Sequence, residues 1–432
     1  MNICFHNIHI INPSENIDGI FNLHIVNGTI ANITQDKIAL DSLTEIIDAT
    51  GMVAAPGFID IHTHLREPGY THKETFQTGT SAAANGGFTE IVCMPNTKPA
   101  IDNVIIVENI LNKTKNYLTQ IHIAAAITQE RKGELLTNMH SLKEVGALYF
   151  TDDGNCVLSA DVMKRVLEYI ADKNYLLAQH CEEHSLTKNF AINESDISMK
   201  LGLIGYPAVA EEIIVDRDIK LCEYYRNKNQ ETCRYHIQHI STAGTLDIIK
   251  NAKSRGTRVS CEVTPHHLWF DDTNLLNYDS NYKMNPPLRK KNDKYELIEG
   301  LKNNIINCIA SDHAPHSSEE CEVEFEKVPN GIIGLETSLG AILTLLHHKH
   351  NFYLDEIINL MSINPRKIVG LDLIRIGIDE KANLTIFSPN KEWIVDKNKF
   401  KSMGRNTPFD KIKFKGIPEY TINNNQIWKC SL

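Results

Sequence analysis

Between residues 56 and 369, short apolar runs typical of strands alternate with longer segments typical of helices. Strands are expected at eight places, namely 58–62, 88–94, 121–126, 146–150, 175–179, 235–239, 257–263 and 305–310. Helices are expected between them, at about 74–85, 103–117, 141–145, 160–173, 208–228, 242–255 and 293–302, with another near 335–347. Strands that alternate with helices pair in parallel. Eight such units restrict the fold more than any other feature of the chain, and they predict an α/β fold with a (β/α)8 barrel.

Both ends of the chain show strand patterns alone. Residues 3–11, 23–26 and 29–33 alternate near the start, and Asn27-Gly28 between the last two runs is a strong hairpin signal. Residues 382–387, 420–422 and 426–428 form a similar pattern near the end. We therefore expect residues 1–55 and 370–432 to build one small β-sandwich beside a catalytic barrel of residues 56–369.

The composition argues against several classes of protein. The net charge is −10 and no run of Lys or Arg offsets it, which argues against nucleic acid as a partner. Ten cysteines are scattered without a Cys-x-x-Cys pair, so neither a zinc ribbon nor a disulfide framework is indicated, and a reducing compartment is expected. The first residues lack a basic leader, and no apolar run approaches the length of a membrane span. We expect a cytoplasmic protein that does not enter a membrane.

The first expected strand ends in a His-x-His pair, His62 and His64. Side chains two apart in a strand share a face, so both imidazoles point the same way. Two imidazoles that converge from one strand make half of a metal site. Taken alone, the pair is equally compatible with two histidines that merely sit near a strand end.

Other expected strands also end in potential metal ligands, and in such barrels the active site lies at the C-terminal ends of the strands. The six candidates are His62, His64, Asp153, His180, His239 and Asp312. A single strand-end His is often a satisfied polar residue, and Asp before Gly is often a turn residue, but packing alone does not explain six together. Four imidazoles and two carboxylates suit Zn²⁺ best, although Mn²⁺ or Co²⁺ also accept such ligands. Six ligands exceed the four of one tetrahedral ion, so we expect one or two zinc ions per subunit.

This donor set indicates a hydrolase of an amide-like bond. Metal ions lower the pKa of water and polarise a substrate carbonyl. Asp312, at the end of the eighth strand, is placed to take a proton from the attacking water and return it to a leaving nitrogen.

Four side chains near the same strand ends are candidates for binding an anionic substrate: Arg66, Asn96, Asn285 and His316. Arg offers a two-pronged donor for carboxylate, and Asn adds a directional amide. They predict a small acidic substrate. The alternative for Arg66 is a surface ion pair with Glu67.

Three motifs resemble those of the dihydroorotases of the amidohydrolase superfamily, and the similarity extends over nearly the whole chain. They are His62-Thr63-His64-Leu65-Arg66-Glu67-Pro68-Gly69, Met94-Pro95-Asn96-Thr97, and Asp312-His313-Ala314-Pro315-His316 followed by Gly331-Ile332-Ile333-Gly334-Leu335-Glu336-Thr337. The resemblance implies reversible, metal-dependent cyclisation of N-carbamoyl-L-aspartate to L-dihydroorotate in pyrimidine (UMP) biosynthesis.

The resemblance also implies a role for each residue. His62 and His64 bind one zinc, His180 and His239 bind the other, Asp153 bridges them, and Asp312 is both ligand and acid/base. Arg66, Asn96, Asn285 and His316 hold the substrate, with help from backbone groups of Asn330-Gly331.

One departure leaves the number of metals open. Many amidohydrolases bridge their metals with a carboxylated Lys on the fourth strand, but Gly146–Phe150 contains no Lys. In the bacterial branch that this chain resembles, Asp153 takes that place, and Asp152 is the alternative ligand.

His266 and His267 at the end of the seventh strand are expected to be structural or to support the site from outside. For Glu182-Glu183 we expect solvent exposure or an outer supporting position.

Several alternatives stay open. Another cyclic-amide hydrolase, such as an allantoinase or a dihydropyrimidinase, is the nearest rival, although Arg66 and Asn96 favour a substrate carboxylate. A non-catalytic homologue that serves as a scaffold for aspartate carbamoyltransferase would be expected to have lost ligands. An active enzyme that needs this transferase to order the long polar loops 183–206 and 313–331 is a weaker form of that idea. A homo-oligomer of this chain is a further candidate assembly.

Overall fold

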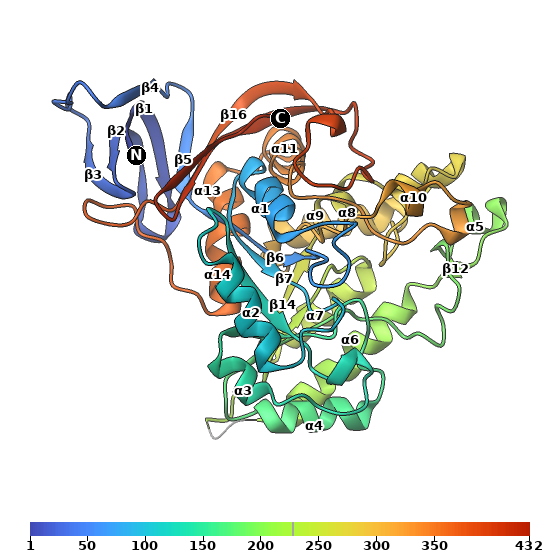
Figure 1. Cartoon of the computed structure of the whole chain (residues 1–432). Coiled ribbons are helices and arrows are strands. Elements are labelled where there is room, and N and C mark those ends of the chain that lie inside the picture. Colours follow the sequence, from blue (N-terminus) through green and yellow to red (C-terminus); the bar gives the residue numbers. More distant parts are fainter. Residues whose placement is uncertain (227–228) are drawn as a thin grey trace.

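A barrel of eight parallel strands lies at the centre of the computed structural model, which describes residues 1–226 and 229–432 (Figure 1). Its strands are β6 (Phe58–Thr63), β7 (Phe88–Cys93), β8 (Gln120–Ala125), β9 (Ala147–Phe150), β10 (Leu176–Gln179), β13 (Arg234–Ile237), β14 (Val259–Val263) and β15 (Cys308–Ile309). They pair in this order. The first and last strands meet through a parallel bridge between Thr63 and His313, where His64 N donates to His313 O at 2.8 Å. The predicted (β/α)8 barrel is confirmed, with a strand at each of the eight expected places.

Seven helices connect successive strands on the outside of the barrel (Figure 1). They are α1 (Phe76–Asn85), α2 (Val104–Thr114), α3 (Met139–Glu144), α4 (Ala160–Ile170), α6 (Val209–Tyr224), α7 (Ala243–Ser254) and α9 (Lys291–Lys302). Five begin at a capping side chain that accepts a backbone N–H of the first turn: Thr75, Asn103, Asn138, Ser159 and Thr242. The helix expected over 208–228 ends at Tyr224, and positions 227–228 of that prediction lie outside the described residues.

The helical segment after β15 is longer than expected. The helix expected near 335–347 begins at Ser338, as α11 (Ser338–Ile342), and continues through a π-helical turn (Leu343–His347) into α12 (His348–His350). A second segment, absent from the sequence prediction, follows as α13 (Leu354–Ile358), another π-helical turn (Asn359–Ile363) and α14 (Asn364–Val369).

The long loops at the C-terminal ends of the strands carry short elements of their own. After β10 come β11 (Ile192–Asn193), α5 (Asp196–Leu201) and β12 (Gly205–Tyr206), and β11 pairs with β12. Helix α8 (Pro265–Trp269) follows β14, and α10 (Ser318–Cys321) follows β15.

Strands from both ends of the chain share one further sheet. It contains β1 (Asn2–Asn12), β2 (Ile17–Val26), β3 (Thr29–Thr34), β4 (Glu45–Asp48), β5 (Val53–Pro56), β16 (Leu384–Ile394), β17 (Lys413–Asn423) and β18 (Gln426–Lys429). Val26 pairs with Thr29 across Asn27-Gly28, which confirms the expected hairpin. β5 pairs with β1 on one side and with β16 on the other, so it joins the two ends. The proposed β-sandwich and its boundaries at residues 55–56 and 369–370 stay a prediction.

Successive side chains of the barrel strands alternate between two buried hydrophobic clusters. Ile91, Ile123 and Leu177 belong to the same hydrophobic cluster as the helix residues Val107 and Val166. The residues next to them on the strands, among them Val92, Ala124 and Ala178, belong to a separate cluster. Apolar side chains thus fill both faces of the barrel strands, and the polar side chains that line the cavity lie where the strands end.

Among residues 1–226 and 229–432, none of the helices has the length and apolar character that a bilayer span requires.

Candidate active site

A cavity of about 230 Å³ opens among the C-terminal ends of the barrel strands. Its lining residues are His64, Arg66, Asn96, Asp153, Gly154, His180, His239, Asn285, Asp312, Ala314, His316, Asn330 and Gly331. Of the residues expected at the site, His62 is the one that does not line this cavity; it is fully buried and contacts Asp153. The structure thus brings all the expected site residues to one place.

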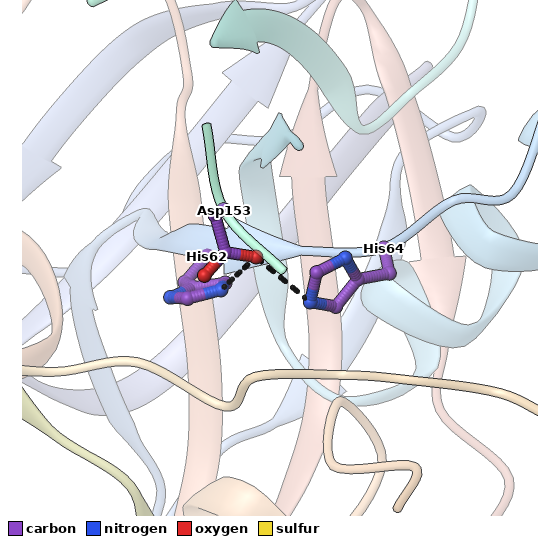
Figure 2. A group of neighbouring side chains, drawn as sticks. All are labelled: His62, His64 and Asp153. Atoms are coloured by element: carbon purple, nitrogen blue, oxygen red, sulfur yellow. Dashed lines mark ion pairs between the residues drawn. The ribbon is translucent and has the colours of Figure 1, made fainter. Parts of the chain in front are cut away.

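Asp153 lies between the imidazoles of His62 and His64 (Figure 2). Its Oδ2 is 3.3 Å from His62 Nε2 and 3.4 Å from His64 Nε2. Both histidines come from the end of β6 and face the same side, as the alternation of a strand requires.

The other oxygen of Asp153 faces a second pair of histidines. Its Oδ1 is 3.5 Å from His239 Nε2 and 3.9 Å from His180 Nδ1, and these two nitrogens are 2.9 Å apart. His180 follows β10 and His239 follows β13. Each carboxylate oxygen thus serves a different pair, which is the arrangement of a bridging ligand.

These atoms fit metal ions better than they fit hydrogen bonds with one another. His62 Nε2 and Asp153 Oδ1 are buried and have no hydrogen-bond partner among the described residues, and such orphaned atoms are costly. Ligands held about 2.0–2.1 Å from a tetrahedral zinc ion lie roughly 3.3 Å apart. The separations of Asp153 Oδ2 from the two imidazole nitrogens, 3.3 and 3.4 Å, match that spacing.

Charge at the site also favours a cation. Burial alone would lower the pKa of His62, but Asp153, Glu262 and Asp312 raise it well above its usual value. The pKa of Asp153 is held well below its usual value because His62 and His239 outweigh the effect of burial. Buried carboxylates are paired or coordinate metals. The buried carboxylates of Asp153, Glu262 and Asp312 around His62 therefore favour the binding of metal ions.

Asp312 follows β15 and completes the group around the first histidine pair. Its Oδ1 is 2.9 Å from His64 Nε2 and 3.5 Å from His62 Nε2. Burial would raise the pKa of Asp312, but His62 and His64 lower it well below the usual value, so the carboxylate is ionised. Asp312 and His239 have positive φ angles of 49° and 31°, and such strained backbone is concentrated at functional sites.

Three of the histidines donate their second ring N–H to an outer acceptor. His62 Nδ1 donates to Glu262 at 2.6 Å, and His180 Nε2 donates to Glu182 at 2.8 Å. His64 Nδ1 lies 2.8 Å from Asn96 Oδ1, which can only accept. These bonds hold the N–H on the outer nitrogen of each ring and so direct the inward nitrogen toward the position of a metal ion. Glu182 therefore has an outer supporting position, as expected.

Glu262 was missed by the sequence prediction. It is fully buried on β14, and burial would raise its pKa, but His62 and His236 lower the value to about 2. A single carboxylate within the mainly apolar strand Val259–Val263 could have indicated that Glu262 is buried for a functional reason. Glu262, His236 and Cys308 also lie close together, but Glu262 is already bonded to both histidines.

The contacts of Asp152 and Asp153, which follow β9, show that only Asp153 faces the histidines. Asp152 faces away from the histidines and accepts the backbone N–H groups of Ile127 at 2.9 Å and Thr128 at 3.0 Å. Arg131 Nη1 donates to the carbonyl of Asp153 at 2.9 Å. Asp152 and Arg131 therefore hold the loop that presents Asp153, and the supporting part of Arg131 was not predicted.

Arg66 is a half-buried cation at the cavity, and the burial lowers its pKa to about 10. Among the described residues, only its Nε makes a hydrogen bond, to Pro315 O at 3.1 Å. The alternative pairing with Glu67 is wrong, because Glu67 pairs with Lys113 and accepts the N–H of Phe76. The rest of the guanidinium is available for an anion.

The other expected substrate residues surround the same cavity. Asn285 Nδ2 donates to Glu182 at 2.8 Å, while its Oδ1 is buried without a partner among the described residues. His316 Nε2 donates to Asn330 O at 2.9 Å. His267 Nε2 donates to Pro286 O at 3.0 Å and so supports the loop of Asn285 from outside, as expected.

Comparison with known proteins agrees with this geometry. Residues 51–245 match the family model described as "Dihydro-orotase-like". A curated dihydroorotase of Aquifex aeolicus is 43% identical over 98% of this chain and 97% of its own length. Another, of Syntrophus aciditrophicus, is 41% identical over 99% of both chains.

Among solved structures, the L-hydantoinase (dihydropyrimidinase) of Arthrobacter aurescens has the same fold. It superposes with a TM-score of 0.86 at 22% identity and covers 100% of this chain and 97% of its own. The extent and identity of the matches to the curated relatives show that this chain belongs to the dihydroorotase family.

Proposed function

We propose that this protein is a dihydroorotase, which interconverts N-carbamoyl-L-aspartate and L-dihydroorotate in pyrimidine (UMP) biosynthesis. The observation that carries the proposal is one cavity in which two histidine pairs share Asp153, Asp312 lies beside the first pair, and Arg66 offers a free cation. Such a cavity suits a small cyclic amide that bears a carboxylate.

Two zinc ions are the cofactor that we propose for the site. His62, His64 and Asp312 would hold one, His180 and His239 the other, and Asp153 would bridge them. When bound, the ions supply a lowered pKa for water and polarise the amide carbonyl of the substrate.

The residues on the other side of the cavity bind and orient the substrate in this proposal. Arg66 holds the carboxylate of L-dihydroorotate, and the amide nitrogen of Asn96, whose oxygen is occupied by His64, donates to the same group. The unpaired Oδ1 of Asn285 is an acceptor for a ring N–H. His316 and the backbone of Asn330-Gly331 close the cavity around the ring.

Asp312 moves the proton. In hydrolysis its carboxylate accepts a proton from the water that attacks the ring carbonyl carbon, and gives it to the ring nitrogen as the C–N bond breaks. In cyclisation the same steps run backwards, and water leaves as the ureido nitrogen joins the side-chain carboxyl carbon. Hydrolysis consumes one water molecule, cyclisation releases it, and neither direction needs an oxidant or a reductant.

Hydrolysis of an uncharged cyclic amide, as in a dihydropyrimidinase or an allantoinase, is the second candidate. The L-hydantoinase (dihydropyrimidinase) structure named above shares only the fold, at 22% identity. An uncharged ring offers no anionic group to the free donors of Arg66 at the cavity, so the acidic substrate is favoured.

The proposal also covers the compartment and the partners of the enzyme. All ten cysteines are free thiols, which supports a reducing cytoplasm. The loops that carry α5 and α10 lie at the C-terminal ends of the barrel strands, and we propose a second copy of the chain or aspartate carbamoyltransferase as the partner that orders them. A purely structural homologue is disfavoured because all six expected ligands are present and converge.

Turnover of L-dihydroorotate by the purified protein tests the function, with bound metal quantified on the same sample and Asp312→Ala as the control. Metal-dependent turnover that disappears in the control supports the proposal. Turnover of an uncharged dihydropyrimidine in preference to L-dihydroorotate would reverse the choice of substrate. A protein that binds no metal would refute the mechanism.

A further inference from the structure

Asn406 lies in the C-terminal segment between β16 and β17, outside the cavity, and joins two loops that line it. Its side chain is 7% exposed. Its Oδ1 accepts the backbone N–H of His316 at 3.2 Å, and its Nδ2 donates to Ala314 O at 3.0 Å and to Gly331 O at 2.9 Å. One amide thus ties the loop after β15 to the segment that carries Gly331.

The two tied segments pack closely beside Asn406. A Cβ added to Gly331 would lie 2.7 Å from Ala314 Cβ, and Gly331 has a φ of +123°. The backbone O of Asn406 also accepts the N–H of Ile333 at 2.9 Å. The relative position of the segments is therefore set by contact and by hydrogen bonds made from outside the barrel.

Three groups proposed to bind substrate depend on these two segments. His316 and Gly331 belong to them and line the cavity. Arg66 comes from the loop after β6, but its guanidinium is oriented by Nε, which donates to Pro315 O between the two residues that Asn406 holds.

The segment that presents Asn406 is itself fixed to the barrel. Glu336 accepts the backbone N–H of Lys401 at 2.9 Å and of Ser402 at 3.2 Å. Glu74, in the loop just before α1, accepts the N–H of Met403 at 3.2 Å. Both carboxylates are buried, so Asn406 extends from a rigid base.

We propose that Asn406 is a positioning residue for substrate affinity: it holds His316, Gly331 and, through Pro315, Arg66 in the arrangement that binds the substrate. This inference rests on the proposed function. An amide is suited to the position because it offers one acceptor and two donors at once. In Asn406→Asp the second oxygen would face the carbonyl oxygens of Ala314 and Gly331, and in Asn406→Ala all three backbone groups would lose their partner.

Steady-state kinetics with L-dihydroorotate test the proposal on the full-length metal-loaded protein. We expect KM to rise about ten-fold or more in Asn406→Asp and Asn406→Ala, because unpaired buried groups must be reordered on binding. We expect kcat and metal content to change far less, since Asp312 and the histidines are not touched. Asn398→Asp is the matched control, because Asn398 is exposed, lies in the same C-terminal segment and bonds only to its neighbour Asp396 among the described residues.

A double-mutant cycle with His316→Ala separates positioning from a general loss of stability. If Asn406 acts through this loop, its effect on KM shrinks in the His316→Ala background. Additive effects, or a lower melting temperature with KM unchanged, would overturn the proposal.

Amide hydrogen exchange keeps this test independent of the substrate assignment. If the unchanged protein fails to turn over L-dihydroorotate, the proposed function fails on its own. Faster exchange of the His316 N–H in Asn406→Ala, which removes its acceptor, without such a change in Asn398→Asp still supports the positioning role of Asn406, and unchanged exchange in Asn406→Ala refutes it.

Discussion

Replacing Glu262 by Gln removes the negative charge beneath His62 with little change in shape. Glu262 accepts from His62 Nδ1 at 2.6 Å and from His236 Nε2 at 3.1 Å in a fully buried position. Gln keeps one acceptor and places an NH2 group opposite one of these donors, so one bond is lost or His62 changes tautomer. A hydrogen bond to a charged group contributes about 1.5–3 kcal/mol. We therefore expect metal affinity to fall about 10- to 100-fold.

A competition titration of the metal-free protein with a coloured chelator measures this loss without reference to activity. Glu90→Gln is the matched control, because Glu90 is also a buried carboxylate bonded to a histidine, His122, at 2.7 Å. It touches none of the expected metal ligands. We expect the control to lose stability but keep its metal affinity. Unchanged metal affinity in Glu262→Gln, or an equal loss in the control, would refute the reasoning.

Three further results are expected. Asp312→Asn should lower kcat roughly 10²- to 10⁴-fold, the usual contribution of a general acid–base group, with the circular dichroism spectrum unchanged. Arg66→Met should raise KM for L-dihydroorotate about ten-fold or more while leaving any turnover of uncharged dihydropyrimidines unaffected. The pKa of Glu90 is lowered to about 2, because His122 and Arg366 outweigh burial, so its contribution to the free energy of unfolding is complete above the unfolded pKa, about 4.3. That contribution should disappear as the pH falls from about 5 towards 2, and urea titrations should show a weaker acid dependence in Glu90→Gln.

The sequence was sufficient to predict the barrel and the residues that converge in it. Strand alternation places His62 and His64 on one face, and a parallel barrel brings all strand ends to the same mouth. These rules are local or follow from the topology, so Asp153, His239 and Asp312 could be assigned to the mouth without coordinates.

Residues that act through tertiary contacts could not be predicted in the same way. Glu262 supports His62 only because closure of the barrel leaves a single strand, β15, between β14 and β6, and Asn406 meets His316 across 90 residues of chain. The segment 354–369 was missed because a π-helical turn and Pro365 interrupt the helical period. A pattern of apolar residues does not report such contacts or such interruptions.

Because β5 bonds to β1 and to β16, the sheet shared by both chain ends cannot be completed until the chain has passed residue 384. All six expected metal ligands lie before residue 313, whereas Asn406 comes after β16. During synthesis, where N-terminal parts fold first, the chain would gain the capacity to bind metal before its substrate cavity is braced. A protein interrupted between residues 370 and 400 would then be a metal-binding barrel with weak affinity for substrate.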